Sequence, residues 1–127
     1  MVLDTHAWVW WVASQSKLSK RARAAVAAEA ELGVCVVSAW EVAMLAEKKR
    51  IGFDRDVEQW VHDALNRPRV VVLELTPEIA VAAARLGDGF HGDTIDRMIA
   101  ATALRLDCAV VTKDRKLRAY APLRTVW

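Results

Sequence analysis

Five short apolar runs, rich in β-branched residues, are separated by longer segments of helical character, and this alternation limits the possible folds more than any other feature. The runs span residues 1–3, 34–37, 69–75, 108–112 and 123–127. The run at 34–37 is apolar along its whole length, which is typical of a strand covered on both faces. Strands that alternate with helices form parallel sheets, and right-handed crossovers place the helices on both faces. The sequence therefore predicts an α/β fold.

The segments between the runs have the composition and the boundary residues of helices. We predict helices over 18–31, 39–50, 56–66, 77–86 and 93–107, and a turn into a short helix over 113–120. Ser19 and Thr76 are predicted N-caps, Pro77 suits a first helical position, and Gly33 is expected to end the first helix. No linker divides the chain, so residues 1–127 are predicted to form a single domain.

The cysteines, the apolar runs and the charges of the chain bear on its compartment and on its partners. Cys35 and Cys108 lie in or beside apolar runs and form no Cys-x-x-Cys pair, so we expect reduced core residues and a cytoplasmic protein. No apolar run reaches the ~18 residues of a membrane span. The net charge is only +2, but cations cluster at 17–23, 47–50 and 113–118. Each cluster is either a solvated helix face or a contact for a polyanion.

Four carboxylates stand at special places in this pattern. Asp4 ends the first strand, Glu41 is expected in the first turn of its helix, Asp96 lies near the start of the helix from 93, and Asp114 follows the fourth strand. The carboxyl ends of parallel strands share one edge of a sheet. We therefore expect the acids that follow strands to face one cleft, joined by Asp96 if its helix begins at that edge.

Carboxylates that crowd together raise a physical difficulty that a cation would remove. They repel each other, and burial costs several kcal/mol for each charge. A hard divalent cation relieves both effects, and a set of oxygen ligands suits Mg²⁺ or Mn²⁺. Such an ion can activate water to attack a phosphodiester. A metal site for phosphodiester hydrolysis is therefore the functional prediction from these residues.

Each acid also has a purely structural interpretation, which the residues alone leave open. The stretch 38–41 is Ser-x-x-Glu, the spacing of a capping box, and 93–96 is Asp-x-x-Asp with the same spacing. Asp114 could cap the short helix that follows it, and Asp4 could form an Asx-turn.

Four stretches, in this order, resemble one known family: "VLDTHAWVWW", "VVSAWEVAMLAEKKRIGF", "HGDTIDRMIAATA" and "VVTKD". The chain resembles the PIN-domain family, and within it the VapC-type toxin ribonucleases of bacterial toxin–antitoxin pairs. The resemblance implies a three-layer α/β/α sandwich around a mostly parallel sheet. It also implies a metal-dependent endoribonuclease that uses Mg²⁺ or Mn²⁺. The family's catalytic and metal-binding acids fall on Asp4, Glu41, Asp96 and Asp114.

The resemblance also suggests residues that support these acids. Thr112 matches the hydroxyl of a Thr-x-Asp motif and is expected to orient a ligand or water, and Arg97 follows the third acid. Asp93 is a further carboxylate near the site, to which we assign capping or support rather than metal ligation. Thr94 and Ile95 replace a Pro-Phe pair that many relatives carry, which removes a proline from the helix start.

The resemblance finally implies partners: an RNA substrate, a protein antitoxin that fills the active-site groove with an arginine-bearing tail, and a second copy in a homodimer or a larger toxin–antitoxin complex. No membrane partner is expected. The tryptophans at 8, 10 and 11 are predicted core or interface anchors. The alternative function is a catalytically silent PIN module that binds RNA or protein. A phosphoaspartyl phosphatase is disfavoured, because the stretch Asp4-Thr5-His6 lacks the second acid of an Asp-x-Asp pair.

Overall fold

A five-stranded parallel sheet forms the centre of the computed structural model, which describes all residues from Met1 to Trp127. The strands are β1 (Val2–Leu3), β2 (Leu32–Cys35), β3 (Val70–Leu73), β4 (Val110–Val111) and β5 (Thr125–Val126), in the order β3-β2-β1-β4-β5. The helices are α1 (Thr5–Ala13), α2 (Lys20–Ala28), α3 (Val36–Glu47), α4 (Val57–Leu65), α5 (Pro77–Ala84), α6 (Thr94–Arg105) and α7 (Arg115–Ala119), with a 3₁₀ turn, η1 (Gln15–Lys17). None of them is both long and apolar enough to cross a membrane.

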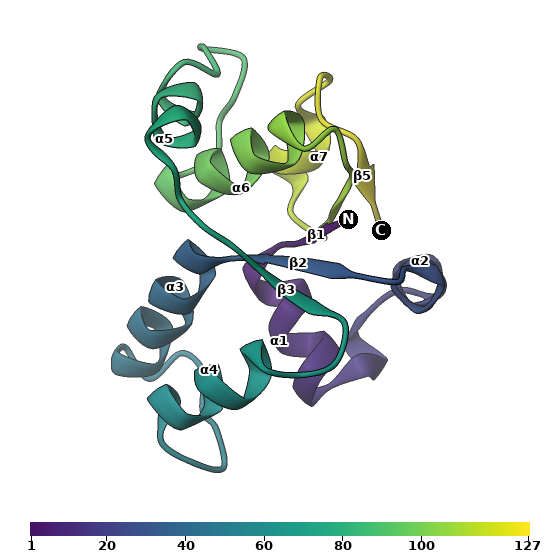
Figure 1. Cartoon of the computed structure of the whole chain (residues 1–127), viewed down its shortest axis with the longest axis vertical. Coiled ribbons are helices and arrows are strands. Elements are labelled where there is room, and N and C mark those ends of the chain that lie inside the picture. Colours follow the sequence, from purple (N-terminus) through teal and green to yellow (C-terminus); the bar gives the residue numbers. More distant parts are fainter.

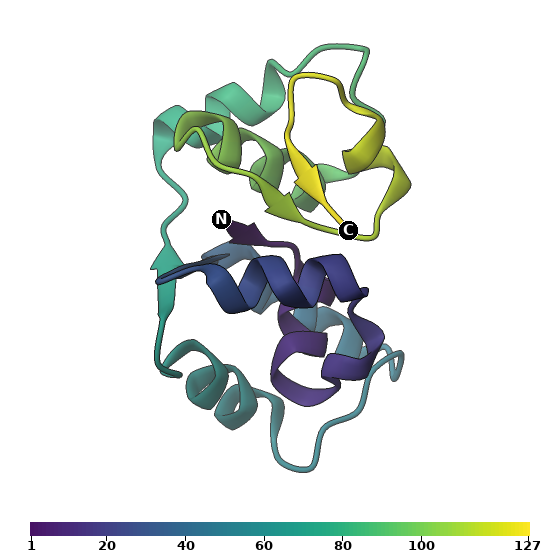
Figure 2. The ribbon, with the colours of Figure 1, turned by 90° about the vertical axis from the view of Figure 1, so that its right-hand side faces the viewer.

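The helices form two layers, one on each face of the sheet. Helices α1 to α4 cover one face and α5 to α7 cover the other (Figure 1 and Figure 2). Successive residues of β1 serve the two cores, because Leu3 packs with α1, α2 and α4 while Val2 packs with α6 and α7. The predicted three-layer α/β/α sandwich is confirmed.

Helix α1 is the one helix that the sequence pattern did not predict. Its nine residues, THAWVWWVA, are almost all apolar, and Trp8 and Trp11 are both buried, as predicted for core anchors. A helix buried on most sides shows no polar face and therefore lacks the periodicity by which helices are detected. The consequence is that Asp4 lies at the start of a helix as well as at the end of a strand.

The second strand and the helix after it are displaced from their predicted positions. Strand β2 includes Gly33, which was expected to end the preceding helix, and that helix already ends at Ala28. Helix α3 begins at Val36 rather than at 39, so Ser38 lies inside the helix and Glu41 in its second turn. The β-branched pair 36–37 favours a strand locally, but tertiary packing overrides this weak preference.

The remaining helix starts follow the predicted chemistry. The Ser19 side chain accepts a hydrogen bond from the Ala22 N–H (3.0 Å) and begins α2. Thr76 accepts one from the Ile79 N–H (3.2 Å), and Pro77 stands at the first position of α5. Strand β5 pairs parallel with β4, as expected for a final edge strand.

Candidate functional site

The strand order of the sheet reverses at β1, which lies between β2 and β4. In α/β proteins, ligands bind in the crevice outside the carboxyl ends of the strands at such a switch point. Asp4 is the first residue after β1, and Thr112 is the first after β4. The register pairs Leu3 with Val111, and the Asp4 N–H donates to the Val111 carbonyl oxygen (3.1 Å). Asp4 and Thr112 therefore stand opposite each other at the switch point.

The Asp4 carboxylate is buried and held at both oxygens, with 6% of the residue exposed. Its Oδ1 accepts the N–H of Ala7 (2.7 Å), which caps α1, and its Oδ2 accepts the hydroxyl of Thr112. Burial raises the pKa of Asp4 above its ordinary value, while these two hydrogen bonds work in the opposite direction. The helix cap and the charged site therefore share one side chain.

The Thr112 hydroxyl joins two of the predicted acids. Besides donating to Asp4, its oxygen accepts the backbone N–H of Asp114 (2.9 Å). The Asp114 carboxylate in turn caps α7, where its Oδ1 accepts the N–H groups of Lys116 (2.7 Å) and Leu117 (3.2 Å). Thr112 therefore positions the Asp4 carboxylate and the Asp114 backbone, and its predicted role toward a ligand or water stays a prediction.

Asp96 reaches the same edge because α6 begins there. Asp93 and Asp96 form a reciprocal capping box, in which the Asp96 N–H donates to Asp93 Oδ1 (2.9 Å) and the Asp93 N–H donates to Asp96 Oδ2 (3.3 Å). Burial, followed by the negative charges of Asp93, Asp114 and Glu41, raises the pKa of Asp96 to about 7. Asp93 is thus the N-cap, in agreement with the capping role assigned to it.

Glu41 differs from the other three acids in having no structural task. It is half-buried in α3, and its side chain makes no hydrogen bond or ion pair within the chain. The capping box with Ser38 that the sequence allowed is wrong, because α3 starts two residues before Ser38. Instead, Ser38 is fully buried and its Oγ accepts the hydroxyl of Thr5 (3.0 Å). We call Asp4, Glu41, Asp96 and Asp114 the acidic edge.

Sequence reasoning missed this hydroxyl pair and misjudged the neighbourhood of Arg97. Thr5 and Ser38 each follow a strand within three residues, which is the one signal in the sequence that could have pointed to them.

The Arg97 guanidinium contacts none of the four acids. It donates to the carbonyl oxygens of Phe90 (3.2 Å) and Ala83 (3.4 Å) and lies 5.4 Å from the centroid of the Phe90 ring. Arg97 therefore ties the 83–90 segment to α6.

The acidic edge has the chemistry of a site for a hydrated hard cation. Its donors are all oxygens, and no lysine or arginine forms a salt bridge with any of them. No three of the chain's carboxylate, imidazole or thiol side chains lie close enough together to share one ion directly. Mg²⁺ usually keeps several water ligands and needs only one or two carboxylates. One or two of Asp4, Asp96 and Asp114 could bind such an ion directly, and the remaining acids could bind it through its water ligands.

Comparisons with known proteins agree with this architecture. The PIN domain model matches residues 1–123. Ribonuclease VapC22 of Mycobacterium tuberculosis is 39% identical over 129 residues, which cover 100% of this chain and 98% of that protein.

Solved structures share the fold at lower identity. VapBC2 from Rickettsia felis, bound to a DNA fragment from its promoter, has a TM-score of 0.70 at 13% identity and covers 98% of this chain and 95% of its own. VapBC-1 from nontypeable Haemophilus influenzae has a TM-score of 0.70 at 18% identity, with coverages of 98% and 94%. Sequence match, fold and the carboxylates at the switch point lead to one assignment: the chain belongs to the PIN-domain family.

Proposed function

We propose that this protein is a metal-dependent endoribonuclease and the toxin of a toxin–antitoxin pair. The observation that carries the proposal is the acidic edge, where carboxylates without basic partners gather at the switch point, and where burial together with the neighbouring negative charges raises the pKa of Asp96 to about 7. A full-length relative named a ribonuclease supports RNA as the substrate. Structural neighbours described as VapBC proteins or a toxin–antitoxin complex support the biological setting.

The four acids divide the work according to their surroundings. Asp4, Asp96 and Asp114 would surround the cation, one or two of them as direct ligands and the rest through its water molecules, and the hydrogen bonds that fix Asp4 and Asp114 limit their motion. When bound, Mg²⁺ or Mn²⁺ would polarise the phosphodiester and lower the pKa of a water molecule. Glu41, which has no partner in the chain, is free to bind a second ion or to orient the attacking water by accepting its proton. The substrate's 2′-hydroxyl takes no part, so the product carries a 5′-phosphate.

Cleavage of total cellular RNA by purified, antitoxin-free protein tests the proposal. The reaction is run with Mg²⁺, with Mn²⁺ and with a chelator, for the wild type, for Asp96→Asn and for Asp88→Asn, an exposed loop acid that serves as the control. We expect discrete fragments that require metal, persist in the control and vanish in Asp96→Asn.

Three results would overturn this proposal. Cleavage that survives both the chelator and Asp96→Asn excludes the acidic edge as the active site. Ends that carry 2′,3′-cyclic phosphate exclude attack by water. Metal binding without cleavage of any cellular RNA would identify a binding module instead.

We further propose two protein partners, an antitoxin and a second copy of the chain. An arginine-bearing antitoxin segment would satisfy the carboxylates of the acidic edge through charge-assisted hydrogen bonds. The second copy would cover β3, an edge strand, and α5, where Val71, Val72, Leu75 and Val81 are 36–50% exposed. Light scattering should report a dimer that Val81→Glu converts to a monomer, and a wild-type monomer would exclude this contact.

A further inference from the structure

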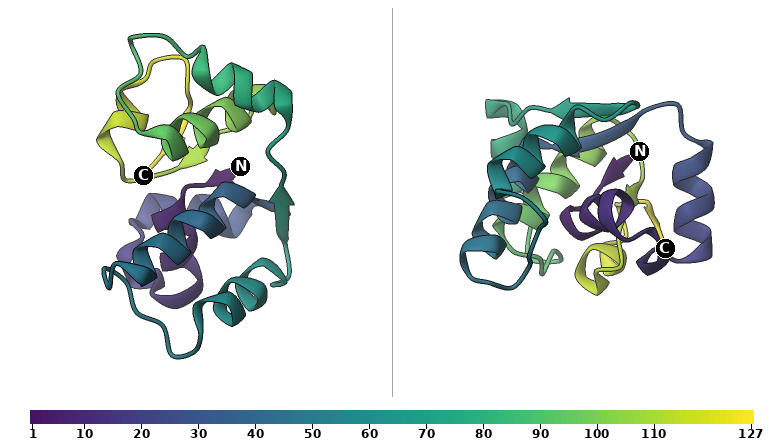
Figure 3. Two further views of the ribbon diagram at one scale, coloured as in Figure 1. Left: turned by 90° about the vertical axis from the view of Figure 1, so that its left-hand side faces the viewer. Right: turned by 90° about the horizontal axis from the view of Figure 1, so that it is seen from below.

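Three arginines line a cavity of about 360 Å³ between α2, α7 and β5. Arg21 comes from α2, Arg115 and Arg118 come from α7, and Ala119, Thr125 and Trp127 complete the lining. The carboxyl end of the chain lies between α2 and α7 (Figure 2 and the right-hand view of Figure 3). We call this the arginine cavity. It unites two of the cation clusters of the sequence, 17–23 and 113–118.

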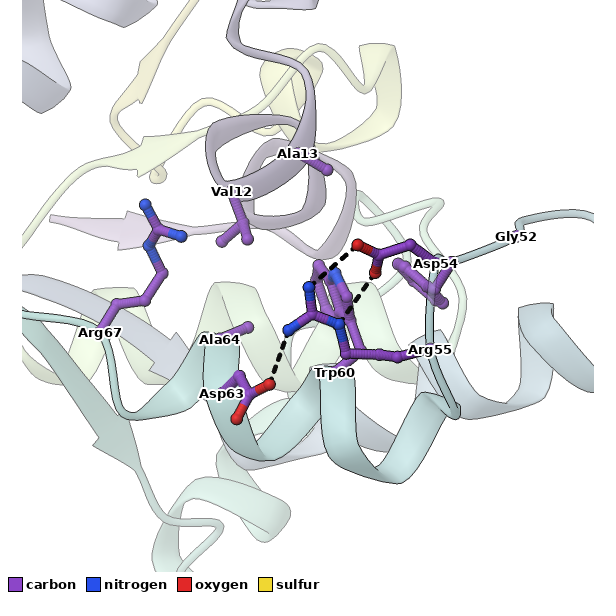
Figure 4. A pocket seen from close by; sticks show the side chains of 10 residues that line it. Val12, Ala13, Gly52, Asp54, Arg55, Trp60, Asp63, Ala64 and Arg67 are labelled. Carbon is purple, nitrogen blue, oxygen red and sulfur yellow. Dashed lines mark hydrogen bonds and ion pairs between the residues drawn. The ribbon is translucent and has the colours of Figure 1, made fainter.

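The three guanidinium groups of the arginine cavity have no acidic partner and donate no hydrogen bond within the chain. A second cavity, between α1 and α4, shows the contrast (Figure 4). There, Arg55 donates to Asp54 (2.9 Å) and to Asp63 (2.7 Å), so its charge is paired with two carboxylates of the chain itself. Of these two cavities, only the arginine cavity therefore offers several uncompensated positive charges to a ligand.

The chemistry of this lining fits phosphate groups and a base. Arg115 and Arg118 are three residues apart on α7 and so lie on one side of it, while Arg21 contributes from α2. The planar guanidinium binds phosphate through paired hydrogen bonds. The half-buried Trp127 ring in the wall gives a face on which a nucleobase can stack.

Residues that line the arginine cavity are neighbours of residues at the acidic edge. Arg115 directly follows Asp114, the cap of α7. On the other side, the Trp127 ring lies 5.9 Å from the Trp10 ring, which lies 5.7 Å from His6, two residues after Asp4. Lys113 adds a further cation 6.0 Å from the Trp10 ring. Residues of the cavity therefore adjoin residues of the acidic edge both at the start of α7 and through these aromatic contacts.

We propose that Arg21, Arg115 and Arg118 hold the backbone of single-stranded RNA on one side of the cleaved bond, with a base against Trp127. This inference rests on the proposed function and supplies what the acidic edge lacks. Carboxylates repel a polyanion, so the free energy of substrate binding has to come from cations beside them. The combination of arginines with an aromatic face favours RNA over an acidic peptide.

The test compares two double variants that remove the same charge from the same two helices. Arg21→Gln/Arg118→Gln alters the cavity, while Arg23→Gln/Lys116→Gln changes exposed cations on α2 and α7 that do not line it. Binding of a fluorescein-labelled single-stranded RNA of mixed sequence is measured in an Asp96→Asn background, which prevents cleavage. We expect the cavity variant to raise Kd about tenfold and, because two phosphate contacts are lost, to lower the salt slope of log Kd by about 1.4, with a change in Kd below about threefold in the control.

Cleavage kinetics then separate binding from chemistry. In the otherwise wild-type protein, the cavity variant should raise KM by the same factor and leave kcat within about twofold. Trp127→Leu should weaken binding several-fold, whereas Trp127→Phe retains it.

Distinct results would overturn the subsite and the proposed function. Equal RNA affinity for the two double variants excludes the arginine cavity, whatever the wild type cleaves. Binding of polyglutamate, a model acidic peptide, is measured for the same variants. If the cavity variant loses polyglutamate binding and keeps RNA binding, the cavity binds an acidic protein segment instead. If the wild type cleaves no RNA and the cavity variant still loses RNA binding, the nuclease proposal fails and the binding site stands.

Discussion

The acidic edge and the arginine cavity meet at the start of α7, yet the protein holds their charged groups in opposite ways. Asp4, Asp96 and Asp114 each accept backbone N–H groups at the start of a helix. The three arginines of the cavity contact no partner in the chain. Capping hydrogen bonds restrict the position of a carboxylate, and bond-breaking chemistry requires groups held to within about 0.5 Å. Free guanidinium groups can adapt to a flexible polymer.

This difference predicts how substitutions divide between stability and activity. An acid that also caps a helix affects both when it is replaced. Glu41, which caps nothing, affects activity alone, and the arginines affect substrate binding with little effect on the fold.

The largest effect is expected at Asp4, where both roles coincide. Asp4→Asn keeps an oxygen for the Ala7 N–H but removes the charge, so cleavage should fall on the order of 10³-fold or more. Asp4→Ala should also lower the free energy of unfolding by about 1–3 kcal/mol, because α1 loses its cap and Thr112 its acceptor. RNA cleavage and urea unfolding measure the two effects. Full cleavage activity in a folded Asp4→Ala protein would contradict the assignment of both roles to Asp4.

Glu41 should separate activity from stability. Glu41→Gln is expected to reduce kcat on the order of 10²-fold, because the amide cannot accept a proton from water. The free energy of unfolding should change by less than about 0.5 kcal/mol, since no bond within the chain is lost. Glu47→Gln, an exposed acid on the same helix, is the control. A large stability loss in Glu41→Gln would reveal a structural role that the contacts do not show.

The ionisation of Asp96 should make the free energy of unfolding depend on pH. Its pKa is raised from 3.8 to about 7, so the folded protein binds this proton more tightly than the unfolded chain. The free energy of unfolding in the absence of metal therefore falls as pH rises from about 4 to about 7. After allowance for solvent screening, Asp96→Asn should gain about 1 kcal/mol at pH 8 and nothing below pH 4.

Urea unfolding in chelator at the two pH values measures this difference. The Asp96→Asn variant can keep the capping box, because the amide oxygen that it introduces can still accept the Asp93 N–H. Asp88→Asn is again the control. An equal gain at both pH values would show that the stabilisation does not come from the proton.

The smallest effect is expected for the arginine cavity in the absence of RNA. Arg21→Gln/Arg118→Gln should leave the free energy of unfolding within about 0.5 kcal/mol of the wild type, because neither side chain has a partner to lose. Thermal and urea unfolding at low salt measure it. A destabilisation above about 1 kcal/mol would mean that these arginines support the fold, and the contrast with the acidic edge would fail.

The sequence was informative where a local rule and the tertiary structure agree. Asp93 and Asp96 have capping-box spacing, and the structure contains that capping box. It misled at 36–37, where a strand preference gave way to a helix, and at Ser38, which the helix therefore encloses. Arg97 follows the third acid in the chain, but the helix turns its guanidinium toward Phe90 and Ala83. Neighbours in sequence on a helix face different directions.

The sequence by itself determined the α/β alternation, the parallel sheet and the acids at the ends of its elements, because short-range periodicity and strand polarity dictate them. Only the tertiary structure decided that Asp4 bonds Thr112 across 108 positions of sequence, and that Glu41 remains without a partner. Only the fold united the basic segments 17–23 and 113–118 in one cavity. The physical reason is the same in each case: strand order and helix packing set distances between residues that are remote in the chain, and no local pattern encodes those distances.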